Sequence, residues 1–333
     1  MNLEKINIKK KHHFVSQFYL QRWTKNGVLR ISNGKGHIFN SKVENIGFES
    51  KFYKIVMFKF SQIKLFEEFC IKNDFDDLES FKLIVGPLLD LQKTIYSTEE
   101  YIKKLEYKKI NCDKKTEELN KLKEIFKYNT IEDKFNDEES QYSLILSKVI
   151  NSNNKTIFTF KDYCSLIFFA IFQLFKTPNK INNITFSDEN KKKLDEFNFD
   201  KDELHTFKIY CLLCITERIN QIRLKNVDKI NVYYNISAID FITSDDPCFN
   251  QISKNSSFYI QLPISPRVSI EICENNEKNK SEIFEFYNND LHFDSISVSG
   301  TLINFCEADK KYVADLNKKI LANKDKHIFY RKK

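Results

Sequence analysis

Two adjacent histidines near the N-terminus, His12 and His13, are followed by Gln17 in the segment KKHHFVSQFYLQRW. Histidine suits acid–base work near neutral pH and is a common metal ligand, and a glutamine can orient a substrate oxygen. In an extended segment the two histidines point to opposite faces, so only one faces a given pocket. If a helix begins near Val15, His13 and Gln17 project from one turn. A buried histidine that satisfies backbone groups explains the pattern equally well, so both interpretations stay open.

A second group of polar residues lies in ITSDDP, residues 242–247, at the predicted end of a strand. Pro247 prevents a regular ladder from continuing, so Ser244 and Asp245 are expected in a turn, where a scaffold presents chemistry. Asp245 could bind a divalent cation, act as a base or orient His13, with Ser244 beside the substrate. The alternative is a turn in which serine and aspartate satisfy their own backbone.

The compact catalytic motifs that spacing alone reveals are absent from the sequence: Walker loop, GxGxxG, HExxH, GxSxG and cysteine–histidine zinc knuckle. The order HH, Asn26, His37 loosely resembles a histidine-metal nuclease finger. That motif needs its last histidine on a helix, whereas His37 lies in a predicted hairpin turn. Cys211 and Cys214 form a CxxC without a second pair, so we expect them reduced, metal-free and packed on a helix face.

Composition indicates a globular chain with a mildly basic surface. The 333 residues are 41% hydrophobic and 30% charged, and no run approaches the roughly 20 apolar residues that span a bilayer. The N-terminus lacks the apolar stretch of a secretory signal, so we expect a cytoplasmic protein without a membrane partner. The net charge of +7 permits a nucleic-acid partner. Arginine is scarce, and Arg267 in the turn PISPR could contact an anion, although a rigid proline turn is the alternative.

The periodicity of apolar residues predicts an α+β fold in one domain, residues 1–333. Residues 10–60 and 227–333 are β-rich and expected to share one sheet or core, and residues 61–226 form a large helical insertion. The first part contains a predicted hairpin, VLRIS–SNGKGH–IFNSKV, and a further strand-like segment at 51–60. Within the insertion, residues 97–127 are typical of a protruding helical hairpin that opens on a capping box at Ser97.

Several segments, in this order along the chain, resemble a known family. They are HHFVSQFYL, a strand-ending Tyr53, QLFKTP at residues 173–178, ITSDDP, PISP at residues 263–266 and a late Asn304. This pattern resembles domain-of-unknown-function family 4238, whose members carry segments like HHYVPQFYL, QxxRTP, TSDNP and PLSP, and the resemblance covers residues 10–330. Ser16 stands in place of proline, Lys176 of arginine and Asp246 of asparagine. If position 176 clamps a phosphate or carboxylate, lysine keeps the charge but loses the bidentate geometry.

Two hypotheses of function follow. The first is a hydrolase acting on a phosphodiester or nucleic-acid substrate, a metal-dependent nuclease-like effector in bacterial antiviral defence with a divalent cation as cofactor. Its catalytic residues would be His13, Gln17 and Asp245, its metal ligands His13 and Asp245, and its substrate-binding residues Lys176, Arg267 and Ser244. The second is a non-catalytic ligand-binding or protein-interaction module, with the helical hairpin 97–127 as the surface for a protein partner. Convergence of the motifs on one open cleft would favour the enzyme, and separate burial would favour the module.

Overall fold

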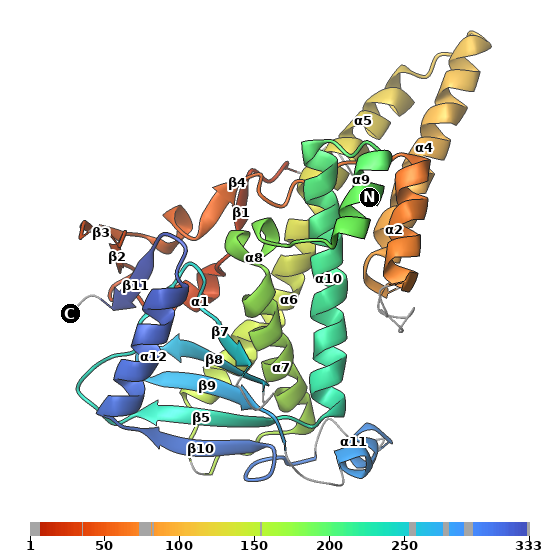
Figure 1. The fold of residues 1–333 in the computed structure, drawn as a ribbon. Coiled ribbons are helices and arrows are strands. Elements are labelled where there is room, and N and C mark those ends of the chain that lie inside the picture. Colours follow the sequence, from red (N-terminus) through yellow and green to blue (C-terminus); the bar gives the residue numbers. More distant parts are fainter. Residues whose placement is uncertain are drawn as a thin grey trace. The chain divides into compact units, whose positions relative to one another are not determined.

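The computed structural model describes residues 7–34, 36–72, 81, 83–153, 155–252, 258–275, 280–289 and 296–331 (Figure 1). The chain divides into two compact units, each assembled from three separate stretches of sequence. The first unit comprises Met1–His12, Glu49–Asn136 and Ile181–Arg218, and the second comprises His13–Phe48, Asp137–Lys180 and Ile219–Lys333. The units therefore do not coincide with the three consecutive parts predicted from periodicity.

Helices dominate the first unit, which confirms a helical insertion between strand-containing regions (Figure 1). They are α2 (Phe60–Lys72), α4 (Gly86–Tyr107), α5 (Asp113–Tyr128), α9 (Asp188–Glu196), the beginning of α6 (Thr130–Ile150) and most of α10 (Lys201–Lys225). Their core is aromatic: Phe66 meets Phe207 edge-on with ring centroids 4.9 Å apart, and Phe58 contacts both rings. Such pairs add to the free energy gained by burying the rings.

Helices α4 and α5 form the predicted hairpin, with the break between them at residues 108–112 (Figure 1). The predicted capping box at Ser97 is wrong. Helix α4 already begins at Gly86 with a proline in its first turn, and the Ser97 hydroxyl donates to the Lys93 carbonyl at 3.0 Å. A serine inside a helix can bond the carbonyl four residues back, so the local signal for a helix start does not distinguish the two positions.

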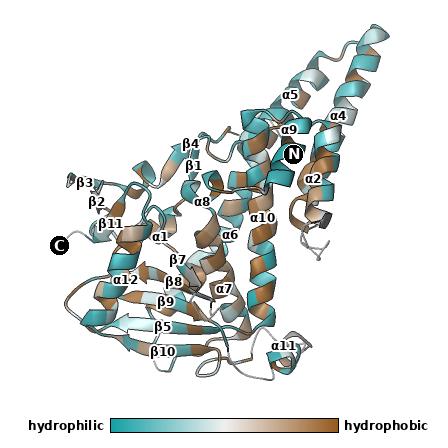
Figure 2. Cartoon of the chain, in the orientation of Figure 1, coloured by the Kyte–Doolittle hydropathy of each residue, from teal (hydrophilic) through white to brown (hydrophobic). Residues whose placement is uncertain are grey.

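The second unit is built on a five-stranded sheet in the order β10-β5-β9-β8-β7. Its strands are β10 (Ile303–Ala308), β5 (Lys229–Asn235), β9 (Val268–Cys273), β8 (Phe258–Ser265) and β7 (Phe249–Ile252), of which only β10 and β5 pair in parallel. Helix α12 (Lys310–Asn323) packs on this sheet, where Tyr312 stacks on Tyr233 with 4.2 Å between ring centroids. Helix α7 (Phe160–Phe175) is buried along most of its length and is largely hydrophobic (Figure 2).

A smaller sheet in the order β3-β2-β11-β6 joins the two ends of the chain. The predicted hairpin is confirmed as β2 (Leu29–Ser32) and β3 (Ile38–Ser41), and the C-terminal strand β11 (Ile328–Arg331) pairs with β2 and with β6 (Thr243–Ser244). N- and C-terminal strands thus share one sheet, as predicted. Two short strands, β1 (Lys11–His13) and β4 (Phe48–Ser50), form a separate pair.

One segment of the β-rich regions differs from prediction. Residues 51–59 form turns and irregular chain instead of a strand, because the buried residues Phe52, Tyr53, Ile55 and Phe58 do not alternate with exposed ones. The short helices η2 (Val43–Asn45), α1 (Gln17–Gln21), α8 (Pro178–Asn182) and α11 (Lys280–Asn289) complete the described elements.

Candidate functional site

His12 is a structural histidine of the first unit. Its side chain is fully buried, and its ring stacks on Tyr53 with 5.9 Å between centroids. The Tyr53 backbone N–H donates to Nδ1 at 2.7 Å, and Nε2 donates to the Lys9 carbonyl at 3.3 Å, an arrangement that requires the tautomer with its proton on Nε2. His12 therefore uses both ring nitrogens for hydrogen bonds to the backbone.

The burial of His12 should make unfolding depend on pH. Burial lowers the pKa of His12 below the value of about 6.5 that it has in the unfolded chain. The unfolded state therefore binds more protons as the pH falls through about 6.5, and the free energy of unfolding decreases there. We expect His12→Ala to lose about 1–3 kcal/mol at neutral pH by leaving backbone groups unpaired, and to flatten this pH dependence. Urea denaturation on both sides of the transition measures both effects; an unchanged pH dependence in the variant would contradict the assignment.

His13 and Gln17 form a polar pair in the second unit. His13 ends strand β1 and is half-buried against Phe48, and Gln17 is exposed at the first position of α1. The Gln17 amide nitrogen lies 3.1 Å from His13 Nε2. The predicted helix start near Val15 is wrong, since α1 begins at Gln17 and His13 belongs to a strand, but the two side chains still meet in a hydrogen bond. The pair places an imidazole and an amide where solvent reaches them.

The backbone beneath this pair depends on a glycine. The N–H groups of Phe14 and Val15 both donate to the Gly47 carbonyl, at 2.9 and 3.1 Å. Gly47 has φ of +65°, and a Cβ there would lie 3.1 Å from Leu20 and 3.2 Å from Val15. Since both the left-handed conformation and the close approach disfavour a side chain, glycine suits this position before α1.

Lys176 lies in a buried polar cluster of the second unit. Its side chain is 1% exposed, and Nζ donates to Glu139 Oε1 and, at 3.1 Å, to Ser16 Oγ. Ser16 in turn donates to the same Glu139 oxygen at 2.6 Å, and the Gln173 amide donates to Ser16 at 3.2 Å. The predicted anion clamp is thus occupied by a carboxylate of the chain itself.

Tyr19 joins three of the motif segments. Its buried hydroxyl donates to the Pro263 carbonyl at 2.6 Å and lies 2.6 Å from Thr243 Oγ1. Burial raises the pKa of this phenol well above its ordinary range, so it remains a neutral donor. The HHFVSQFYL, ITSDDP and PISP segments therefore meet at one hydroxyl group.

Asp246 connects the QLFKTP segment to ITSDDP. Its carboxylate accepts from Asn179 at 2.9 Å and from Thr177 at 3.4 Å, and Lys180 lies 3.5 Å away. The Ser244 hydroxyl donates to the Asp246 carbonyl at 2.8 Å and accepts from its N–H at 3.2 Å. Burial raises the pKa of Asp246, opposed by Lys180. Ser244 therefore satisfies backbone groups of its own turn, which is one of the two alternatives that the sequence left open.

Asp245 holds the chain that leads into β11. Its two carboxylate oxygens accept the backbone N–H groups of Asp325, Lys326 and His327 at 3.0, 2.7 and 2.7 Å. Arg267 is engaged in a similar way with the backbone carbonyls of Asn235 and Ser237, and lies 3.4 Å from Asp240. Both side chains therefore have structural partners in the positions where ligand binding was predicted.

The structure thus brings the motifs together through buried contacts. Hydrogen bonds connect HHFVSQFYL, QLFKTP, ITSDDP and PISP, although they are far apart in sequence. Among the described residues, no three His, Cys, Asp or Glu side chains are grouped as metal ligands. Of the predicted residues, Lys176, Ser244 and Asp245 are buried, whereas His13, Gln17 and Arg267 lie at the solvent boundary, Arg267 with its guanidinium bonded to backbone carbonyls. The catalytic and metal-binding roles assigned from the sequence stay predictions.

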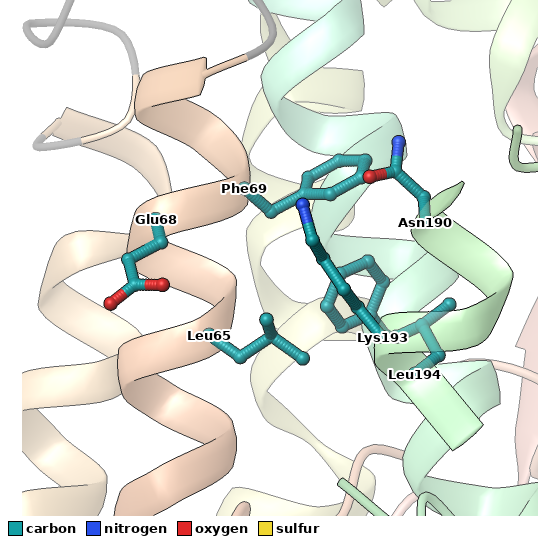
Figure 3. A pocket seen from close by; sticks show the side chains of 7 residues that line it. Leu65, Glu68, Phe69, Asn190, Lys193 and Leu194 are labelled. Atoms are coloured by element: carbon teal, nitrogen blue, oxygen red, sulfur yellow. The ribbon is translucent and has the colours of Figure 1, made fainter. Parts of the chain in front are cut away.

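A pocket in the first unit lies between α2, α9 and α10 (Figure 3). It encloses about 40 Å³, room for a few water molecules, and is lined by Leu65, Glu68, Phe69, Asn190, Lys193, Leu194 and Phe207. Figure 3 shows Lys193 and Asn190 at its rim and Phe69 turned towards them. None of the predicted site residues belongs to it.

The CxxC thiols are buried in α10, as predicted, and all eight cysteines are free of disulfides. Cys70 of α2 lies beside them: a hydrogen bond to Cys214, together with burial, raises the pKa of Cys70. Burial likewise raises the pKa of Cys211. Thiols held in the protonated form are poor nucleophiles and poor metal ligands, which supports a packing role.

A family model described as "Protein of unknown function (DUF4238)" matches residues 11–333, nearly the whole chain. The chain belongs to this family. A search of curated proteins and a search of solved structures each returned no match. Four of the segments that carried the resemblance, HHFVSQFYL, QLFKTP, ITSDDP and PISP, meet around Tyr19, Ser16 and Asp246.

The three residues that the resemblance marked as departures, Ser16, Lys176 and Asp246, all lie in this network. Ser16 and Lys176 are hydrogen-bonded to each other, and Asp246 faces Lys180. Glu139 was not predicted, because nothing local distinguishes it within the acidic stretch DEES.

Helices long and apolar enough to cross a bilayer do not occur in the part of the chain that the structure describes.

Proposed function

We propose that this DUF4238 protein is a cytoplasmic, non-catalytic module that binds a phosphate-containing ligand at His13 and Gln17. The proposal rests on one observation: three of the other predicted residues already bind groups of the protein itself. Lys176, Asp245 and Arg267 are bonded within the protein, so the motif network holds α1 in place while His13 and Gln17 remain at the solvent boundary.

The pair suits a phosphate oxygen for reasons of chemistry and charge. The Gln17 amide nitrogen can only donate, so His13 Nε2 accepts from it, and the second N–H of the amide can donate to a phosphate oxygen. Nearly all of the net charge of +7 belongs to the second unit, which contains the pair. A positive field of this kind raises the local concentration of anionic ligands.

A hydrolase of phosphodiesters, acting as a nuclease-like effector in bacterial defence, is the second candidate. It is favoured by the contact between His13 Nε2 and Gln17, since an imidazole oriented by an amide can transfer a proton to or from a substrate. Against it, Asp245 uses both carboxylate oxygens for backbone N–H groups, so it is poorly placed to serve as a base or as a cation ligand.

The proposal also includes a protein partner for the helical hairpin 97–127. Tyr107 is 90% exposed at its tip, beside Lys103, Lys104 and Lys108. Exposed tyrosine is enriched at protein interfaces, and the surrounding lysines favour an acidic partner surface.

Titration calorimetry with a nucleoside monophosphate, together with turnover of bis(p-nitrophenyl) phosphate with and without magnesium or manganese, separates the two candidates. We expect binding without turnover, and loss of binding in Gln17→Ala but not in the matched variant Gln21→Ala, one turn further along α1. Turnover that disappears in His13→Ala would establish the hydrolase instead. Absence of both binding and turnover would contradict both candidates.

A further inference from the structure

The small sheet presents a solvent-facing surface without acidic residues. None of the twelve residues of β2, β3 and β11 is Asp or Glu. Residues directly opposite each other on paired strands point to the same face, and Arg30 lies opposite both Asn40 and Tyr330. Leu29, Ile31 and Phe329 are buried, which places them on the core face, whereas Arg30 and Tyr330 are partly exposed and Asn40 is exposed.

A stacked cation lies at the centre of this face. The Arg30 guanidinium is 5.4 Å from the centroid of the Tyr330 ring, a cation–π contact across two paired strands. Among the described residues no carboxylate forms an ion pair with Arg30. Ile38, which is 48% exposed, shares the face with Asn40 two residues along β3. Planar, apolar and amide groups thus lie side by side on one surface.

Further cations lie near the ends of strand β2. Lys25 precedes β2 and is exposed. At the opposite end, a Cβ on Gly34 would lie 3.1 Å from the Lys324 side chain, so Lys324 borders the hairpin turn. Cations that flank a row of stacking groups are typical of surfaces that bind the phosphates and the unstacked bases of a single strand.

We propose that the Arg30–Tyr330–Asn40 face binds single-stranded nucleic acid. A base stacks on the guanidinium plane that Tyr330 supports, the Asn40 amide hydrogen-bonds a base edge, and Lys25 and Lys324 contact phosphates. Duplexes fit poorly, because their bases are already stacked on one another and cannot stack on the guanidinium. The ligand class follows from the proposed function, but the surface is distinct from His13 and Gln17.

Fluorescence anisotropy with labelled single-stranded RNA, single-stranded DNA and the corresponding duplex tests the proposal on the full chain. We expect single strands to bind more tightly than the duplex, and Tyr330→Ala to weaken binding about tenfold or more, since each stacked base contributes about 1–3 kcal/mol. Tyr330→Phe should bind within about twofold of the wild type, because it keeps the ring. Arg30→Lys, which keeps the charge but not the plane, should weaken binding several-fold.

Tyr101→Ala, which truncates a tyrosine 57% exposed on the hairpin of the first unit, is the matched control and should bind normally. The proposal is overturned if single strands do not bind, if the duplex binds equally well, or if Tyr330→Ala binds as the wild type does. If Tyr330→Ala fails to fold, Arg30→Lys is the deciding variant, and the proposal is overturned if Arg30→Lys binds as the wild type does. Normal single-strand binding in a chain that does not bind the monophosphate would refute the His13–Gln17 site and leave this surface intact.

Discussion

Lys176→Met is expected to lower the free energy of unfolding by about 3–5 kcal/mol. The substitution leaves the Glu139 carboxylate, which is only 14% exposed, without the cation that neutralises it. Lys176 is 1% exposed, and its ammonium contacts both Glu139 and Ser16, so water cannot replace the lost charge easily. Chemical denaturation followed by circular dichroism measures the effect.

The control for Lys176→Met is Lys193→Met, which removes a surface ion pair with Glu189 and should change stability by less than about 1 kcal/mol. The double variant Lys176→Met with Glu139→Leu should recover part of the loss, since both charges are then gone. Equal, small effects of Lys176→Met and Lys193→Met would show that the buried cluster does not stabilise the fold.

Trp23→Ala should cost about 3–5 kcal/mol, the range for truncating a large buried aromatic side chain. The Trp23 side chain is fully buried, and its ring lies 6.1 Å from that of Tyr19, the residue that joins three motif segments. Loss of the indole therefore removes packing directly beneath the network.

Phe60→Ala serves as the comparison for Trp23→Ala, because Phe60 is 63% exposed and its truncation should change stability by no more than about 0.5 kcal/mol. A loss below about 1 kcal/mol in Trp23→Ala would mean that the α1 region packs independently of the rest of its unit.

Much of the fold follows from local patterns in the sequence. The β-hairpin of β2 and β3 and the helical hairpin of α4 and α5 were both predicted, because each consists of two runs of one periodicity with a break between them. Short elements were predicted less well. Residues 52–58 have the composition of a strand but form irregular chain, and Ser97 has the residue type of a helix cap but lies inside a helix. Both predictions used residue type alone, without the tertiary contacts that decide the structure.

The candidate site was predictable only in part. The proximity of His13 and Gln17 was expected from their closeness in sequence, although the contact forms across the turn between β1 and α1 and not within a helix. The burial of Lys176 depends on Glu139, 37 positions away, and the saturation of Asp245 depends on a turn about 80 positions away. Pairings of that separation have no local signature, so a buried ion pair and an exposed anion clamp look alike in the sequence.

The central claim is that the buried motif residues stabilise the fold while His13 and Gln17 bind ligand. Thermal denaturation and monophosphate calorimetry on His13→Ala test it most directly. We expect the midpoint of unfolding to stay within about 2 °C of the wild type, as for a surface substitution, while binding of the monophosphate is lost. A His13→Ala protein that unfolds as readily as Trp23→Ala, or one that stays folded and binds the monophosphate normally, would contradict the account.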